Sequence, residues 1–245
     1  MNKKPLICKG NWYKNPVIYD FFSRAEDPDN VCFDIVTENL KHQIVNPIDL
    51  ATGTGRMLGL LGHLPFAGKL YGVDKTKTMC DFAKNYYKAE IINGTIEDIG
   101  SMGIESSLII SCFGFPSKVW NKKRAKKEYE AVKSILNGVF ITIGWNEKFD
   151  CELSKMWYNF VPDDIKAVNF KEWQQKKREL ITTPRNCGLT WLKQDVETVL
   201  RFSSLQESAF VMGHLFGAYA MKYVIENNKI EWQMKLGITL DVCRK

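Results

Sequence analysis

Residues 46–59, with the sequence NPIDLATGTGRMLG, constrain the fold of this chain more than any other stretch. An apolar run with one acid, residues 48–50, leads into the glycine turn Gly53-x-Gly55, and an amphipathic run follows from Arg56. A strand-to-helix turn in an open α/β sheet favours glycine, because glycine adopts positive φ and leaves a bare backbone that a ligand can approach. The stretch therefore predicts a strand, a tight turn and a helix.

A second apolar run, residues 70–73, ends on Asp74. The second strand of such a unit places an acid at this point to receive the ribose hydroxyls of an adenosine. Asp49 lies within the first strand, where a carboxylate would repel a pyrophosphate and would suit an ammonium or a sulfonium. We therefore expect a nucleoside that carries a cationic group at these two strand ends, and a nicotinamide oxidoreductase is disfavoured.

The pattern of Asp49, Gly53 and Gly55 resembles motif I of the class I S-adenosylmethionine-dependent methyltransferases. The resemblance implies a Rossmann-like α/β fold in three layers, with a seven-stranded, mostly parallel sheet whose last strand is antiparallel. It also implies S-adenosyl-L-methionine as the methyl donor and S-adenosyl-L-homocysteine as the product. The resemblance extends over residues 10–245 in organisation, but its specific signal lies around 49–55 and Asp74.

The same resemblance assigns the donor site to the motif I turn, to residues after the second, third and fourth strands, and to a Tyr-Asp pair in an N-terminal lid. The donor-binding residues expected on this basis are Tyr19, Asp49, Ala51, Gly53, Gly55, Asp74, Lys75, Met79, Thr95, Ile96, Glu97, Asp98, Ser111 and Phe113. In the family an acid after the third strand reads adenine, and Thr95 holds that position here. The adenine contact is therefore open among Thr95, the Ile96 backbone, Glu97 and Asp98.

Hydrophobic periodicity predicts that the rest of the chain completes a single domain. Residues 1–45 form an N-terminal lid, 46–149 the donor-binding core, 150–190 a helical cap over the substrate, and 191–245 the end of the sheet. The expected helices cover residues 31–44, 77–88, 121–136 and 205–226. The expected strands cover 90–93, 138–144, 190–202 and 230–242, and residues 107–116 form a buried strand that runs into a loop. The alternation of the last strand marks it as antiparallel.

Methyl transfer from a sulfonium needs an in-line nucleophile and exclusion of water, and orientation alone supplies roughly 7–11 kcal/mol of such a barrier. An unprotonated amine can react without a side-chain base, whereas a hydroxyl or thiol usually benefits from one. The three histidines lie away from the expected strand ends, and neither a metal-ligand spacing nor a Ser/His/Asp order is present. We therefore assign no catalytic residue and no metal. The substrate-side candidates are Tyr13, Trp145, Asn146, Trp157 and Arg185.

Composition favours a protein of the reducing cytoplasm. The seven cysteines are scattered without a C-x-x-C pair, and no apolar run approaches the roughly 20 residues that span a bilayer. The net charge is +6, and lysine-rich runs lie at 122–127 and 176–178. Such runs can bind nucleic acid, but the first also fits the solvated face of a helix whose buried stripe includes Ala125 and Tyr129.

The sequence thus predicts a methyltransferase that acts at N or O of a small molecule in a closed pocket, as a monomer or homodimer. An RNA or protein methyltransferase is the alternative. The basic helices support it, and the lack of an appended binding module opposes it. A nucleoside-binding protein without catalysis is the second alternative. We expect the outward faces of both lysine clusters to point away from the carboxyl ends of the strands.

Overall fold

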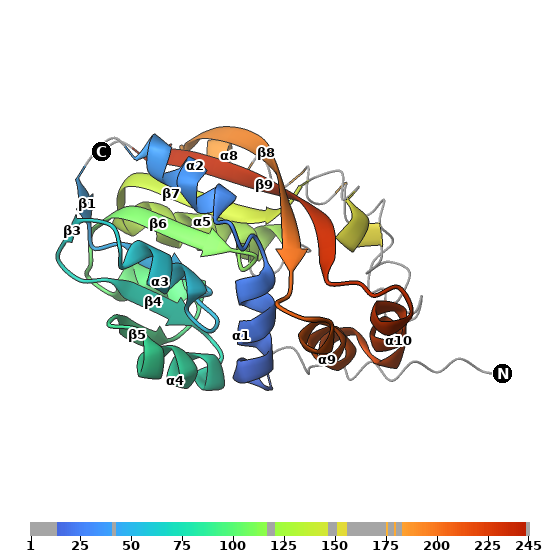
Figure 1. Ribbon diagram of the computed structural model, residues 1–245. Coiled ribbons are helices and arrows are strands. Elements are labelled where there is room, and N and C mark those ends of the chain that lie inside the picture. The colour runs from blue at the N-terminus through green and yellow to red at the C-terminus, as the bar shows by residue number, and fades with distance from the viewer. Residues whose placement is uncertain are drawn as a thin grey trace.

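Within the residues that the structure describes, a seven-stranded β-sheet forms the middle layer, in the order β5-β4-β2-β6-β7-β9-β8 (Figure 1). The computed structural model describes residues 14–40, 43–116, 121–146, 151–155, 175, 179 and 183–243. The strands are β2 (Ile48–Leu50), β4 (Tyr71–Asp74), β5 (Glu90–Asn93), β6 (Ser106–Cys112), β7 (Leu136–Trp145), β8 (Thr190–Arg201) and β9 (Glu231–Cys243). Strand β9 is antiparallel to both neighbours, and the other adjacent pairs are parallel. The predicted fold class is confirmed.

Helices cover both faces of this sheet (Figure 1). One face carries α1 (Pro16–Ala25), α2 (Val31–Asn39), α3 (Arg56–Leu61), α4 (Lys77–Tyr86), α9 (Leu205–Phe216) and α10 (Ala218–Glu226). The other face carries the 3-10 helix η1 (Ile96–Ser101), α5 (Lys122–Ile135) and α8 (Thr183–Asn186). The three-layer arrangement explains why β6 reads as a continuous apolar run: Leu108 and Ile110 enter one core, and Ile109 enters the other.

The β8 and β9 strands extend beyond the end of β7. Trp145, the last residue of β7, pairs with Leu236, but the β8–β9 pairing continues as far as Arg201 and Glu231. The extension lies beyond the carboxyl ends of the parallel strands and contacts the turn between α1 and α2 through an isolated bridge between Glu26 and Leu200. The N-terminal segment is therefore held against the last two strands in the fold.

Several elements differ from the sequence-based expectation. The helix predicted over 205–226 is divided at Gly217, whose φ of 93° ends α9 and starts α10. The helix predicted over 31–44 ends at Asn39, and the chain then forms a small parallel sheet of β1 (Ile44–Val45) and β3 (Phe66–Ala67) that no pattern indicated. These short pairs carry too few residues to show a strand period.

Candidate functional site

The turn after β2 adopts the left-handed backbone that glycine favours. Gly53 has a φ of 54° and Gly55 a φ of 94°, and Ala51 has a φ of 55° although it carries a Cβ. A Cβ on Gly53 would lie 3.2 Å from Cε1 of Tyr19, so the bare backbone at this position lets α1 approach the turn. Gly55 serves packing instead, because a Cβ there would meet the ring of Tyr87 at 2.6 Å.

Asp74 joins the ends of the two strands that the sequence placed at one site. Its Oδ2 accepts a 2.9 Å hydrogen bond from the Gly53 backbone N–H, and its Oδ1 accepts a 2.7 Å bond from the Thr76 backbone N–H. The carboxylate is partly exposed and is oriented by both bonds. Its remaining lone pairs are available to hydroxyl donors.

Two adjoining cavities lie at the carboxyl ends of the strands. The outer cavity, of about 750 Å³, is lined by Asp74, Lys75, Thr95 and Ile96, and the inner cavity, of about 630 Å³, extends to Asp49. Both volumes include space open to solvent. The side chains and backbone common to the two cavities belong to Tyr19, Ala51, Cys112 and Phe113.

The four residues considered for the adenine contact fall into two groups: two line the outer cavity, and two have side chains that are engaged in other interactions. Thr95 and Ile96 line the cavity. Asp98 instead caps η1, because its Oδ2 accepts bonds of 2.7 Å from the Thr95 N–H and 2.8 Å from the Thr95 hydroxyl, and these bonds lower the pKa of Asp98. Glu97 forms an ion pair of 2.9 Å with Arg124.

Arg124 is a lining residue that the sequence did not single out. It belongs to the lysine-rich run, but its side chain lies in the outer cavity and also pairs with the fully buried Glu128 at 3.2 Å. The sequence did offer one sign of this ion pair: Arg124 and Glu128 are four residues apart, so they lie on the same face of a helix. The lysines of this run do not line the cavity, so the expectation that their outward faces point away from the strand ends stays a prediction.

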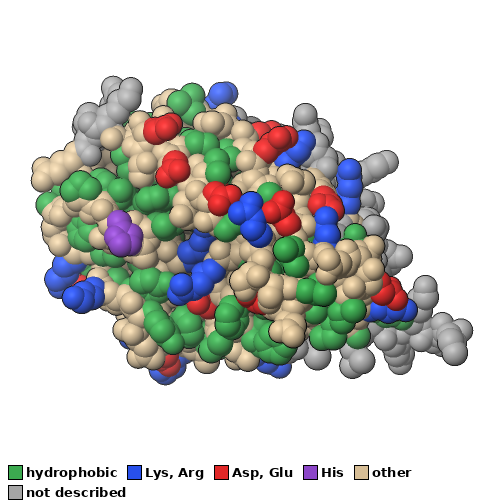
Figure 2. Space-filling model, viewed as in Figure 1, with side chains coloured by type: hydrophobic (Ala, Val, Ile, Leu, Met, Phe, Trp, Pro, Cys, Tyr) green, Lys and Arg blue, Asp and Glu red, His purple; other side chains and the backbone are tan. Residues whose placement is uncertain are grey.

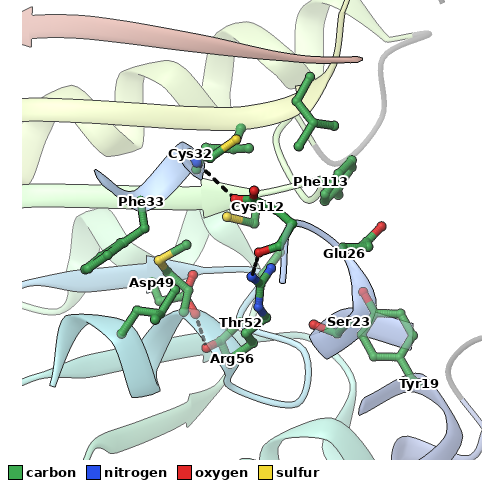
Figure 3. Close-up of a pocket in the computed structure, with 16 residues that line it drawn as sticks. Tyr19, Ser23, Glu26, Cys32, Phe33, Asp49, Thr52, Arg56, Cys112 and Phe113 are labelled. Carbon is green, nitrogen blue, oxygen red and sulfur yellow. Dashed lines mark hydrogen bonds between the residues drawn. The ribbon is translucent and has the colours of Figure 1, made fainter. Parts of the chain in front are cut away.

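The inner cavity is lined by acids, sulfur atoms and apolar side chains (Figure 3). Asp49 is 1% exposed and accepts a 2.5 Å hydrogen bond from the Thr52 hydroxyl. Burial raises the pKa of Asp49 to about 7, and the Thr52 hydrogen bond opposes part of that shift. An ammonium or sulfonium placed here would restore the charged form of Asp49, so the site suits a cation.

Two donor-site candidates are buried in the core rather than in the cavities. Met79 is 1% exposed in α4 and lines neither cavity. Ser111 is fully buried and donates a 2.7 Å hydrogen bond to the Leu50 carbonyl oxygen, which fixes β6 against β2. Their contribution to ligand binding is indirect in this arrangement.

The substrate-side candidates do not converge. The Trp145 ring packs edge-on against Phe113, with 5.7 Å between centroids, and so contacts the residue that borders both cavities. Asn146 is 2% exposed, and its backbone N–H donates to the Lys235 carbonyl oxygen at 3.2 Å. Tyr13 and Trp157 lie outside the described residues.

Arg185 lies far from the expected pocket, at the opposite edge of the sheet. It belongs to α8, just before β8 begins at Thr190, and Thr190 is aligned through Val242 with Val139 near the start of β7. The amino ends of the parallel strands, rather than their carboxyl ends, therefore surround α8. The expectation that Arg185 pairs with a substrate anion in the pocket does not fit this position.

Two residues near the inner cavity were missed by sequence reasoning. Glu26 and Arg56 both line it. Glu26 stands in the polar segment SRAEDPDN, which reads as a solvated turn, and no sequence pattern indicated that its side chain would be buried. Arg56 was recognised only as the start of a helix.

The described residues show neither a group of metal-ligating side chains nor a membrane-spanning helix. None of their His, Cys, Asp and Glu side chains gather in groups of three or more that could hold a metal ion. None of the helices in this part of the chain is long and apolar enough to cross a membrane. On the face shown in Figure 2, Lys and Arg side chains are interspersed with Asp and Glu.

Comparison with solved structures establishes the fold. No family model matches the sequence, and no curated protein matches it in sequence. The structure is similar to the plantazolicin methyltransferase BpumL, solved with S-adenosylhomocysteine, with a TM-score of 0.55 and 13% identity over 96% of this chain and 93% of that one. For the YcgJ protein of Bacillus subtilis the TM-score is 0.56, with 14% identity over 89% of this chain and 99% of that one.

A putative methyltransferase of Bacillus halodurans gives a TM-score of 0.54, with 14% identity over 89% of this chain and 100% of that chain. Likeness at this level of identity shows a shared fold. The chain therefore has the fold of the class I S-adenosylmethionine-dependent methyltransferases.

Proposed function

We propose that this protein is a methyltransferase that uses S-adenosyl-L-methionine. The observation that carries the proposal is the position of Asp74, whose two carboxylate oxygens are held by the Gly53 and Thr76 backbone at the entrance of the outer cavity. A carboxylate fixed in this way accepts two neighbouring hydroxyl groups, as a ribose presents them. The fold, in which ligands bind at the carboxyl ends of the strands, supports the same assignment.

The residues present fit such a donor. Asp74 would hold the ribose, and Thr95 with the Ile96 backbone would contact adenine in the outer cavity. Gly53 lines the outer cavity beside Asp74, and buried Asp49 would receive the positive end of the ligand. When bound, the donor supplies a methyl group that is already activated on a sulfonium. The chain then has to orient an acceptor and exclude water.

We propose a small molecule as the acceptor, methylated at N or O. The inner cavity is lined by residues of α1, α2, α3 and the sheet, including the aromatic residues Tyr19 and Phe113. BpumL and its relative BamL, which share the fold, were solved with desmethyl plantazolicin analogues and S-adenosylhomocysteine.

An RNA acceptor is the second candidate, and one observation favours it. The first turn of α5 carries Lys122 and Lys123 beside Arg124, at the edge of the outer cavity. Lys122 is paired with Glu179 and Lys126 with Glu130, which reduces the charge available to phosphate. The lysine cluster at 176–178 lies outside the described residues.

The lid, the cap, the cellular location and the oligomeric state are also proposals. Within the predicted cap of residues 150–190, we take the part that precedes α8 as a cap over the acceptor, because α8 lies at the opposite edge of the sheet, and we take residues 1–45 as a lid. We place the protein in the cytoplasm as a monomer or homodimer.

Titration calorimetry with S-adenosylhomocysteine tests the donor site. Wild-type protein should bind it, and Asp74→Asn should weaken binding by about tenfold or more, because a charge-assisted hydrogen bond contributes about 1.5–3 kcal/mol. Asp81→Asn on α4 makes the same chemical change at an exposed position and serves as the control. Equal affinity in Asp74→Asn and wild type would remove the ribose assignment.

The acceptor class is tested by methylation of fractionated cell extract. We expect label from the donor to enter the metabolite fraction, and Trp145→Ala should reduce it through loss of the Phe113 contact. Replacement of Lys122, Lys123, Lys126 and Lys127 by Glu should leave it unchanged. Label that enters RNA alone, and that is lost in the lysine variant, would establish the second candidate instead.

A further inference from the structure

A buried acid of the inner cavity has no role in the donor site described above. Glu26 lies in the turn between α1 and α2, is 8% exposed and lines the cavity. Among the described residues, Arg56 is the cation whose charge acts on the Glu26 carboxyl group, and the two side chains are not joined by a hydrogen bond. A carboxyl group that is buried without a hydrogen-bond partner is costly, and Glu26 lines a cavity in which a bound ligand can supply that partner.

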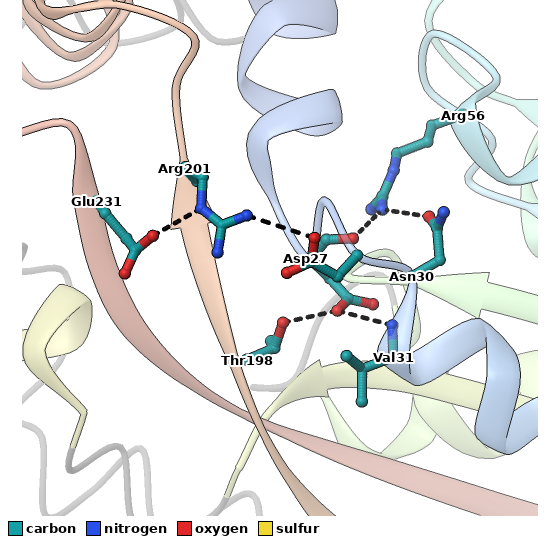
Figure 4. Close-up of polar contacts among 8 residues, drawn as sticks. Asp27, Asn30, Val31, Arg56, Thr198, Arg201 and Glu231 are labelled. Atoms are coloured by element: carbon teal, nitrogen blue, oxygen red, sulfur yellow. Dashed lines mark hydrogen bonds and ion pairs between the residues drawn. The ribbon is translucent and has the colours of Figure 1, made fainter.

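The fold holds Glu26 in this position from three sides. Its backbone pairs with Leu200 of β8, and the Glu26 N–H donates to the Phe22 carbonyl oxygen at 3.1 Å. The neighbouring Asp27 side chain is fully engaged, because it accepts bonds from the Val31 N–H at 3.1 Å and from the Thr198 hydroxyl at 2.6 Å (Figure 4). Glu26 is therefore presented to the cavity on a rigid turn.

The charges that line the inner cavity are mainly negative. Glu26, Asp27 and Asp49 are its acids, and Arg56 is the one cation among the described residues that line it. The Arg56 guanidinium already donates to the Asp27 carbonyl oxygen at 2.6 Å and to Asn30 Oδ1 at 3.1 Å. In Figure 3 the side chains of Glu26 and Asp49 lie on opposite sides of the pocket. The cavity therefore has two separate positions for a positively charged group, one beside Glu26 and one beside Asp49.

We propose that Glu26 binds the amino group of the methyl acceptor, so that the protein is an amine N-methyltransferase. This inference rests on the proposed function, because it takes the Asp49 side of the cavity as the place of the donor's cationic end. An aliphatic or benzylic amine, with its apolar part against Phe113 and Tyr19, matches a cavity lined by a buried acid and aromatic side chains.

The reaction balances with residues of this chain. The acceptor enters as an ammonium, and Glu26 takes the proton that frees its nitrogen lone pair. The nitrogen then forms the new N–CH₃ bond as the S–CH₃ bond of the donor breaks, and the sulfur keeps the bonding pair as a neutral thioether. The methylated ammonium leaves with the positive charge, and Glu26 returns its proton to solvent.

The environment of Glu26 suits this role. The pKa of Glu26 is raised to about 8, mainly by burial; the positive charge of Arg56 opposes the shift, and the negative charge of Asp27 adds to it. A base whose pKa lies near the working pH exchanges protons efficiently. An alcohol acceptor would bind less tightly beside Glu26, because an alcohol brings no positive charge to the buried carboxyl group.

The test compares amines with alcohols on the protein saturated with S-adenosylhomocysteine. The probes are 2-phenylethylamine with 2-phenylethanol, and benzylamine with benzyl alcohol, measured by calorimetry at pH 7. Wild type should bind each amine at least about tenfold more tightly than the matched alcohol, as expected for a charge-assisted contact. Glu26→Gln keeps the side-chain shape and should lose this preference, and the control Glu38→Gln on the exposed side of α2 should keep it.

A second readout separates a binding role from a structural one. Titrations in two buffers of different ionisation enthalpy should show that amine binding releases protons from wild-type protein, and that this release disappears in Glu26→Gln. Absence of an amine preference in wild type, or its persistence in Glu26→Gln, overturns the proposal. Failure of wild type to bind S-adenosylhomocysteine at all would instead overturn the proposed function, so the two results are distinct.

Discussion

Arg56 donates a 2.6 Å hydrogen bond to the backbone carbonyl oxygen of Asp27, and this bond joins the first helix after the motif turn to the turn that follows α1 (Figure 4). The two segments are separated in the sequence but line the same cavity. A guanidinium has several donors in a rigid plane, so Arg56 also reaches Asn30 Oδ1 at 3.1 Å. The lid is thus attached to the helix that begins at the donor site.

Arg56→Lys should loosen this attachment, because an ammonium does not reproduce the planar pair of bonds. We expect a loss of about 2–3 kcal/mol in the free energy of unfolding, the magnitude of a hydrogen bond to a charged group. Urea denaturation measures it. Arg201→Lys is the control, since Arg201 pairs with Glu231 and Asp29 at an exposed site where ion pairs contribute little. Equal losses in the two variants would contradict the role of Arg56.

Donor binding should order the N-terminal lid. In the described part of that segment, α1 presents Tyr19 to both cavities and packs Phe22 against Phe216 of α9. A bound ligand would cover the Tyr19 face and reduce local opening of the helix. Hydrogen exchange with and without S-adenosylhomocysteine should show slower exchange over 16–25, and unchanged exchange there would argue against a lid.

Gly53→Val should abolish donor binding and leave a folded protein. The substitution forces a β-branched residue into a φ of 54° and directs its side chain toward Tyr19 at the donor turn. Gly103→Val is a matched control, because Gly103 has a φ of 64° and a Cβ there would meet nothing within 4 Å. The two variants should show similar losses of stability by thermal denaturation, but only Gly53→Val should lose affinity in calorimetry. Normal binding by Gly53→Val would leave the turn with a structural role alone.

The part of the site that sequence reasoning found is local in the chain. Asp49 and Gly53 stand in one motif, and Asp74 ends the next strand, so strand adjacency was enough to bring them together. Glu26 was not predictable in this way. Its burial depends on β8, and the nearby bond from Thr198 to Asp27 spans 171 positions.

The position of Arg185 was an error of topology rather than of pattern. The strand that follows it was predicted correctly, and β8 runs parallel to β7 because both are antiparallel to β9. A segment that leaves the carboxyl end of β7 must therefore return to the amino edge before β8 begins. Residues just before β8 are thereby placed away from the donor site, and this deduction needed strand order, which periodicity does not supply.

Burial of Asp241 makes the free energy of unfolding depend on pH, and Asp241 takes no part in the donor site. It lies on β9, is 0% exposed, and neither of its carboxylate oxygens has a hydrogen-bond partner among the described residues. Burial raises the pKa of Asp241 to about 7. The neighbouring Tyr129 and Cys187 do not offset this cost, since burial also raises the pKa of both groups and keeps them neutral.

The sign of the effect follows from proton binding. Because the folded state holds the Asp241 proton up to about pH 7 and the unfolded state releases it near pH 3.8, stability falls as the pH rises through this interval. Asp49 and Glu26 shift in the same direction, so ligand-free protein should be more stable at pH 5 than at pH 8.

Asp241→Asn should remove one part of this dependence. At pH 8 the variant no longer buries an unpaired charge, and we expect a gain of about 1–3 kcal/mol, which corresponds to a rise of about 2–12 °C in Tm for a chain of this size. At pH 5 the wild-type carboxyl is largely protonated and resembles the amide, so the Tm values should nearly coincide. Asp195→Asn on the exposed face of β8 should change neither value appreciably. A lower Tm for Asp241→Asn at pH 8 would mean that the carboxylate is stabilised in the folded protein, and would reverse the assignment.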